Sequence, residues 1–214
     1  MRRLTHILMS PACRLARLAI GEKRLACDLV PAEDPTRHLP IFTDLDGTVV
    51  AGTWAIVDHL ESMHPEHPLV PEETDDRSES LRILDWAMTK FHEEVTRRVL
   101  FEKASRSHTG TLHRQPPNME TIRHGRTALM VHLKALGPLV EARGFVAGRD
   151  LSVADLALAA HLSALDYYGE IPWNDVPAVA EWYMRIKSRP CFRSLLSDRV
   201  PGQPPVLHYA ELDF

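Results

Sequence analysis

Cysteine and histidine are the residues of this sequence best suited to redox or metal chemistry. Cys13 lies near the predicted start of the first helix, where a thiol can become reactive. We favour the alternative, that Cys13 is a small, inert residue packed in the core. The three cysteines have no metal-ligand spacing and are odd in number, so they are expected to be reduced thiols rather than a disulfide framework.

The twelve histidines include no pair with ligand spacing and a third partner that can be identified from the sequence. No metal site is therefore expected. Trp86, Trp173 and Trp182 lie within helical patterns and are expected to belong to the core rather than to a ligand platform.

Composition and charge exclude several classes of function. The chain of 214 residues carries a formal charge of −4, which gives no general electrostatic reason to bind nucleic acid or acidic membranes. No window approaches the roughly 20 apolar residues that span a bilayer. His6, Arg14 and Arg17 interrupt the apolar N-terminus too early for a signal peptide. A cytoplasmic protein without membrane insertion is expected.

Short strand-like and helical segments alternate in the first third of the chain. Ser10-Pro11 is a suitable start for a helix that ends near Gly21, and Asp46-Gly47 is a strong hairpin signal. Apolar runs predict strands over residues 4–9, 25–30, 40–43 and 48–50, and helical spacing predicts a helix over residues 54–63. A stretch rich in proline and acidic residues, 65–73, is predicted to be a linker.

The rest of the chain is helical in pattern. Helices are predicted over residues 81–103, 119–142, 153–165 and 178–187, with a polar loop over 105–118. The predicted fold class is therefore an α/β domain followed by an all-α domain. We expect a first domain over residues 1–64, the linker over 65–73, a helical domain over 74–200 and an extended tail over 201–214.

This order resembles that of the glutathione transferases, and local motifs strengthen the resemblance. Ser10-Pro11-Ala12-Cys13 resembles the strand-to-helix turn that carries the family's catalytic hydroxyl or thiol, and Leu39-Pro40 resembles its cis-proline dipeptide. Ser152-Val153-Ala154-Asp155 resembles the family's helical capping box. The resemblance implies a thioredoxin-like first domain, an all-helical second domain and a homodimer, with the predicted helices 54–63 and 81–99 as candidate dimer surfaces. It also implies glutathione binding by Ser10, Leu39, Pro40 and Thr53, with Ser10 as the catalytic residue.

The sequence departs from the family pattern at Gly52-Thr53. The family usually has an acid or amide before a serine at this point, and that acid or amide receives the γ-glutamyl ammonium group. Thr53 keeps the hydroxyl, but Gly52 cannot accept this bond, whose loss costs about 1.5–3 kcal/mol. We therefore expect glutathione binding to be weak or absent, with an affinity lowered about 10- to 100-fold.

A second departure lies before Leu39. The family normally has a short helical segment between its second strand and the cis-proline, whereas here Pro35-Thr36-Arg37-His38 runs directly into Leu39. Either this helix is deleted, or it is a mobile segment that is missing from the residues given. We favour the second alternative, which predicts a gap between His38 and Leu39.

The last third of the chain contains Ile171-Pro172-Trp173, Lys187-Ser188-Arg189-Pro190 and Asp198-Arg199-Val200-Pro201-Gly202, and it closes with His208-Tyr209-Ala210-Glu211-Leu212-Asp213-Phe214. These segments resemble a narrower group, the FtsZ-localised glutathione-transferase homologues of bacteria. This resemblance implies binding to the tubulin-like division protein FtsZ and regulation of constriction, with Glu211 and Asp213 of the acidic tail as partner-binding residues. Tyr209 and Phe214 are expected to anchor an extended tail without helix. The alternative is an active glutathione transferase that conjugates glutathione to a small electrophile.

Overall fold

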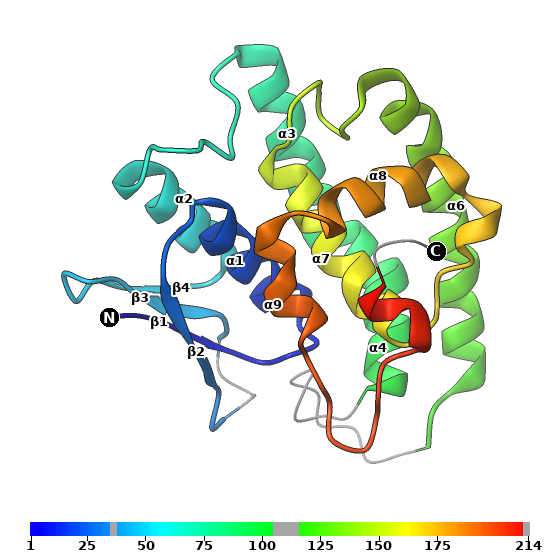
Figure 1. Cartoon of the computed structure of the whole chain (residues 1–214). Helices are drawn as coiled ribbons and strands as arrows, with labels where there is room; N and C mark the ends of the chain where they lie inside the picture. Colours follow the sequence, from blue (N-terminus) through cyan, green and yellow to red (C-terminus); the bar gives the residue numbers. More distant parts are fainter. Residues whose placement is uncertain (35–37, 105–115, 212–214) are drawn as a thin grey trace.

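The computed structural model covers the whole chain, and the structure describes residues 1–34, 38–104 and 116–211 (Figure 1). A small sheet and two helices at the N-terminal end pack against a larger helical unit (Figure 1). The fold class predicted from the sequence, a thioredoxin-like domain followed by an all-helical domain, is confirmed.

The first unit is built on a mixed four-stranded sheet with the order β2-β1-β3-β4. Strand β1 pairs in parallel with β2, and antiparallel pairing joins β1 to β3 and β3 to β4. The parallel pair needs a crossover, which α1 supplies, whereas β3 and β4 are joined by the Asp46-Gly47 hairpin turn. The elements are β1 (Arg2–His6), α1 (Pro11–Glu22), β2 (Cys27–Pro31), β3 (Ile41–Thr43), β4 (Val49–Ala51) and α2 (Thr53–Met63).

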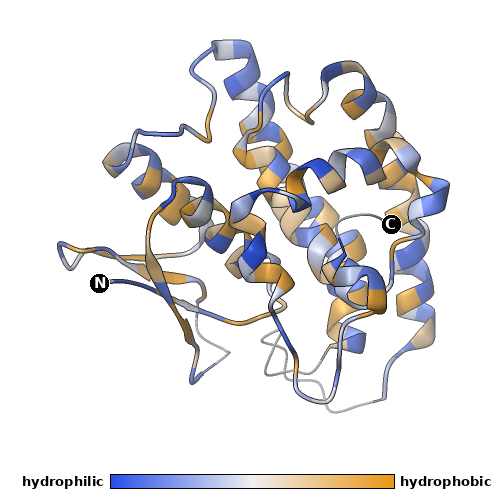
Figure 2. Ribbon diagram, viewed as in Figure 1, coloured by the Kyte–Doolittle hydropathy of each residue, from blue (hydrophilic) through white to orange (hydrophobic). Residues whose placement is uncertain are grey.

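The second unit surrounds a central helix, α7 (Val153–Tyr167), in which every residue is buried. The Ser152–Asp155 capping box at its start is present as predicted. Figure 2 shows hydrophobic and hydrophilic residues alternating around outer helices such as α6, as expected when only one face is buried. The other elements are α3 (Thr74–Trp86), the π-helix η1 (Ala87–Thr96), α4 (Arg97–Lys103), α6 (Met119–Arg143), η2 (Trp173–Asp175), α8 (Pro177–Lys187), η3 (Pro190–Phe192), α9 (Arg193–Leu196) and η4 (Leu207–Ala210).

Three expectations need correction or fall outside the described residues. The expected gap between His38 and Leu39 is wrong, because the full sequence passes directly from one to the other. The described residues between β2 and β3, 32–34 and 38–40, contain no helix. The tail is not free of helix, because η4 forms a 3₁₀ turn after its last proline. Most of the predicted loop 105–118 lies outside the described residues.

Within the described residues, no helix is both long enough and apolar enough to cross a bilayer.

Candidate functional site

The sheet register brings the sequence-predicted site residues to one edge. Thr5, near the end of β1, is opposite Ile41, the first residue of β3, and Ile41 is also opposite Ala51, the last residue of β4. The segment after β1 leads to Ser10, the residue before β3 is Pro40, and the residues after β4 are Gly52 and Thr53. The three chain segments therefore leave the sheet at the same edge.

Ser10 is the N-cap of α1, as predicted. Its hydroxyl oxygen accepts a hydrogen bond from the amide of Cys13 at 3.4 Å, and Pro11 occupies the first turn. The side chain is half-buried. A hydroxyl has one donor as well as its acceptor lone pairs, so the Ser10 O–H is chemically able to donate to an anion beside this helix end.

Cys13 is fully buried, and burial raises the pKa of its thiol. A thiol of this kind is mainly protonated at neutral pH and is a poor nucleophile. The interpretation of Cys13 as a core residue is confirmed, and its inertness stays a prediction.

Leu39-Pro40 is a cis peptide bond, which confirms the expected motif. The Pro40 carbonyl accepts a hydrogen bond from the amide of Gly52 at 2.8 Å, so this turn is fixed directly to the residue that precedes α2. Leu39 is half-buried and Pro40 is buried. The glutathione-binding roles of Leu39 and Pro40 stay predictions.

Helix α2 begins at Thr53, which is buried, and its N-cap Gly52 makes no side-chain capping bond. The first turn contains no acidic residue. The N-terminus of an uncapped helix carries partial positive charge and unpaired amides, which favour an anion such as a carboxylate. This end of α2 therefore keeps the anion-binding half of the predicted site.

The backbone of Gly52 explains why this position lacks a side chain. Its φ of +90° and ψ of 151° lie in a region that is essentially restricted to glycine. A Cβ atom built on Gly52 would also lie 2.7 Å from Nε2 of His38. The imidazole of His38 therefore lies beside the place where the family's acid or amide would begin.

Gly52→Ala should lower the free energy of unfolding by about 1–3 kcal/mol, because alanine is strained at this φ. Urea unfolding would measure the change. Gly137→Ala is the matched control, since this helical glycine has open space around its Cβ position and should be neutral or slightly stabilised. The contact with His38 is at the far end of a flexible side chain. If the double variant Gly52→Ala/His38→Ala were as stable as the wild type, the clash with His38 rather than the strained φ of residue 52 would cause the loss of stability.

The tail is fixed to the helical unit by Tyr209, which is fully buried as predicted. Its hydroxyl donates to the Leu195 carbonyl at 3.0 Å and accepts from Arg14 at 3.1 Å. Glu211 is exposed, which agrees with the expected acidic surface. Asp213 and Phe214 lie outside the described residues.

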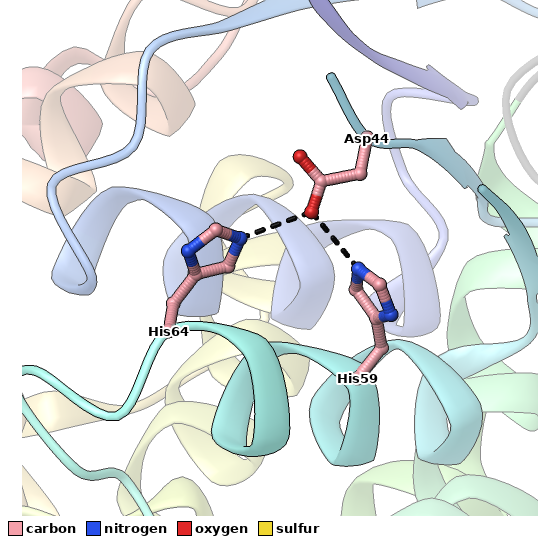
Figure 3. A group of neighbouring side chains, drawn as sticks. All are labelled: Asp44, His59 and His64. Carbon is pink, nitrogen blue, oxygen red and sulfur yellow. Dashed lines mark hydrogen bonds and ion pairs between the residues drawn. The ribbon is translucent and has the colours of Figure 1, made fainter. Parts of the chain in front are cut away.

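A second cluster was missed at the sequence level, and it corrects the expectation that no histidine pair has a third partner. Nε2 of His59 and Nε2 of His64 lie 2.9 and 3.0 Å from the same oxygen of Asp44 (Figure 3). Burial alone would raise the pKa of Asp44, but hydrogen bonds from the two histidines and from the amide of Leu45 lower it overall. The two histidines are five residues apart and the aspartate lies before the hairpin turn, so no local spacing reveals the group.

Comparison with known proteins agrees with this geometry. Residues 4–68 match the family model of the glutathione S-transferase N-terminal domain. Over its whole length the chain is 39% identical to FtsZ-localized protein A of Caulobacter vibrioides, of which it covers 98%. The crystal structure of a glutathione S-transferase from Rhodospirillum rubrum F11 superposes with a TM-score of 0.94 at 37% identity, with both chains fully covered. The structure of FzlA from C. crescentus superposes with a TM-score of 0.93 at 39% identity and covers 100% of this chain and 99% of that chain.

Proposed function

Because the chain belongs to the glutathione S-transferase family, we propose that it acts as an FtsZ-binding regulator of bacterial cell constriction with a weakened glutathione site. The observation that carries this proposal is the 39% identity to FtsZ-localized protein A, which extends over the whole chain. Similarity of the fold alone would not separate a division protein from a transferase, since one fold serves many functions.

The glutathione site supports the proposal because it is incomplete. Ser10, the cis-Pro40 turn and the Thr53 helix end supply groups suited to a thiolate and a carboxylate. Gly52 supplies no acceptor for an ammonium group, and its backbone disfavours any side chain there. Glutathione is therefore expected to bind weakly or not at all.

The tail supports the proposal because it exposes an acidic residue next to a turn that is packed against the helical unit. Tyr209 holds the 3₁₀ turn η4 against the helical unit, and Glu211 follows immediately in the exposed part. The amide of Val206 donates to the Tyr167 carbonyl at 3.1 Å, which ties the start of the turn to α7. Because the preceding turn is fixed, a basic surface of a partner can bind the Glu211 carboxylate at little cost in conformational entropy. Asp213 is proposed to extend this acidic surface.

Glu211→Lys should weaken binding to FtsZ polymer at least tenfold, because a rim charge of the wrong sign opposes association. Folding should be nearly unchanged, since exposed substitutions usually alter stability by about 0.5 kcal/mol or less. Co-sedimentation over a range of FtsZ concentrations gives the affinity. Glu66→Lys makes the same charge change at an exposed site in the linker and should bind like the wild type. Equal binding by folded Glu211→Lys would exclude the tail from the interface.

We also propose that the protein is a cytoplasmic homodimer. Trp54 and Met63 of α2 are 45% and 55% exposed, and both lie on the helix predicted from the family to form a dimer surface. They are nine residues apart and project from different sides of α2, and each is a large apolar side chain that a second copy packed along this helix could cover. Light scattering at micromolar concentration would test this, and a monomer there would contradict it.

The second candidate function is glutathione conjugation, favoured by the retained cis-Pro40 turn and by Ser10 at the start of α1. In this function Ser10 would donate to the glutathione thiolate. A conjugation assay with chlorodinitrobenzene would detect it, and Ser10→Ala should then abolish the activity.

A further inference from the structure

Asp44, His59 and His64 form a compact group of ligand-type side chains outside the proposed glutathione site. Asp44 follows β3 and His59 lies within α2, whereas His64 is the C-cap of α2. The three ligand atoms all lie within 4.8 Å of one another. The side chains are 7%, 11% and 18% exposed, respectively, so the group is shielded from solvent but still reachable. Figure 3 shows both imidazole rings directed at one carboxylate oxygen.

The carboxylate of Asp44 is held in a fixed orientation by groups that would not themselves bind a metal. Its Oδ1 atom accepts from Nε of Arg2 at 2.8 Å and from the amide of Leu45 at 2.6 Å. Both bonds leave Oδ2 directed at the two histidines. Such outer contacts orient metal-binding carboxylates and are a regular part of metal centres.

His64 is fixed in a similar way through its backbone. The Lys23 ammonium donates to the His64 carbonyl at 2.8 Å and forms an ion pair with Glu61 at 2.6 Å. Lys23 is buried, so this arrangement fixes the end of α2 at the point where the chain leaves the helix. The Asp44 carboxylate and the backbone of His64 are therefore held in place by contacts from outside the group.

We propose that Asp44, His59 and His64 bind a divalent zinc ion. Two imidazole nitrogens and one carboxylate oxygen form a ligand set that zinc uses with a fourth position left to water. Calcium and magnesium require oxygen ligands and do not suit two histidines. With zinc–ligand bonds of about 2.0–2.1 Å, neighbouring ligand atoms in a tetrahedral site lie about 3.3 Å apart. The two histidine-to-aspartate distances of 2.9 and 3.0 Å need to open by a few tenths of an ångström, and the two imidazole nitrogens, which lie within 4.8 Å of each other, need to come to the same spacing.

Zinc binding requires each ring to present a lone pair at Nε2. In the metal-free group both Nε2 atoms donate hydrogen bonds to Oδ2, so the ring protons move to the Nδ1 atoms, which face away from Asp44 (Figure 3). The positive charge of Arg2 beside Asp44 reduces the attraction of the site for a cation. Bound zinc would join the β3–β4 hairpin to α2.

Calorimetric titration of the untagged full-length protein with zinc chloride tests this proposal. We expect one ion per chain, and replacement of zinc by cobalt should give the visible absorption bands of a four-coordinate site. The double variant His59→Ala/His64→Ala should lose affinity by more than the 10- to 100-fold typical of removing an outer contact. His124→Ala, which removes an exposed histidine from α6, is the matched control and should bind zinc like the wild type.

Undiminished stoichiometric binding by the double variant, or no stoichiometric binding by the wild type, would overturn the proposal. If the double variant does not fold, labelling of the wild-type histidines with diethylpyrocarbonate tests the site instead. Zinc should then protect His59 and His64, but not His124, as mapped by mass spectrometry. Equal labelling of His59 and His64 with and without zinc would contradict the site.

Discussion

Replacing Asp198 with alanine should lower the free energy of unfolding by about 3–5 kcal/mol, because two buried arginines then lose their counter-ion. Arg17 binds the Asp198 carboxylate through two nitrogens at 2.9 Å each, and Arg14 binds it at 3.1 Å. The Arg14 and Arg17 side chains are 0% and 2% exposed, so water cannot replace the lost partner. Urea unfolding at neutral pH would measure the loss.

The same substitution should also loosen the junction between the two units. Arg14 lies on α1 but donates to the Leu8 carbonyl at 2.8 Å, to the Ser163 hydroxyl at 2.8 Å and to the Tyr209 hydroxyl. Its position therefore fixes both the segment before Ser10 and the base of the tail. Arg82→Ala is the control, because this exposed pair with Glu79 should contribute about 1 kcal/mol or less. An equally small loss in Asp198→Ala would show that the buried network contributes little.

Acidification from pH 7 to pH 5 should lower the free energy of unfolding of the wild type by about 2 kcal/mol more than that of the variant His6→Gln. His6 is buried, and its burial together with the nearby charge of Arg17 lowers its pKa from 6.5 to about 4. The unfolded chain therefore takes up a proton at a higher pH than the folded chain does. The stability contributed by neutral His6 is complete above pH 6.5 and is lost as the pH falls toward 4.

The geometry around His6 agrees with this expectation. In the part of the chain that the structure describes, its Nδ1 atom has no hydrogen-bond partner. Asp198 and the backbone of Ile7 favour the protonated ring, but burial and the charge of Arg17 outweigh them. Denaturant unfolding at several pH values would give both curves, with His124→Gln as a control at an exposed position on α6. Parallel curves for the wild type and His6→Gln would show that His6 does not govern the acid sensitivity.

Much of the fold could be predicted because its signals are local. The capping box of α7, the hairpin at Asp46-Gly47 and the helix start at Ser10-Pro11 each depend on residues within a few positions of one another. The start of α3 was missed because Glu73 caps it, accepting from the amides of Asp75 and Asp76, and glutamate is not a typical capping residue. The π-helix η1 divides the single helix predicted over residues 81–103, and the apolar spacing gave no sign of it.

The features that could not be predicted depend on contacts between distant residues. Arg14 and Arg17 counted at the sequence level only as charges that interrupt an apolar run, because their partner Asp198 is more than 180 positions away for each. The group of Asp44, His59 and His64 likewise depends on how the hairpin packs against α2. The site residues Ser10, Leu39, Pro40 and Thr53 were found only through the family resemblance, which supplies such distant relations.

Co-sedimentation of the wild-type protein with assembled FtsZ, with and without glutathione, tests the central claim most directly. The protein should pellet saturably with FtsZ polymer and stay in the supernatant when polymer is absent. Glutathione should leave the bound fraction unchanged, because the proposed FtsZ contact at Glu211 lies outside the proposed glutathione site at Gly52 and Thr53. Absence of pelleting with polymer, together with rapid conjugation of glutathione to an electrophile, would contradict the account and identify a working transferase.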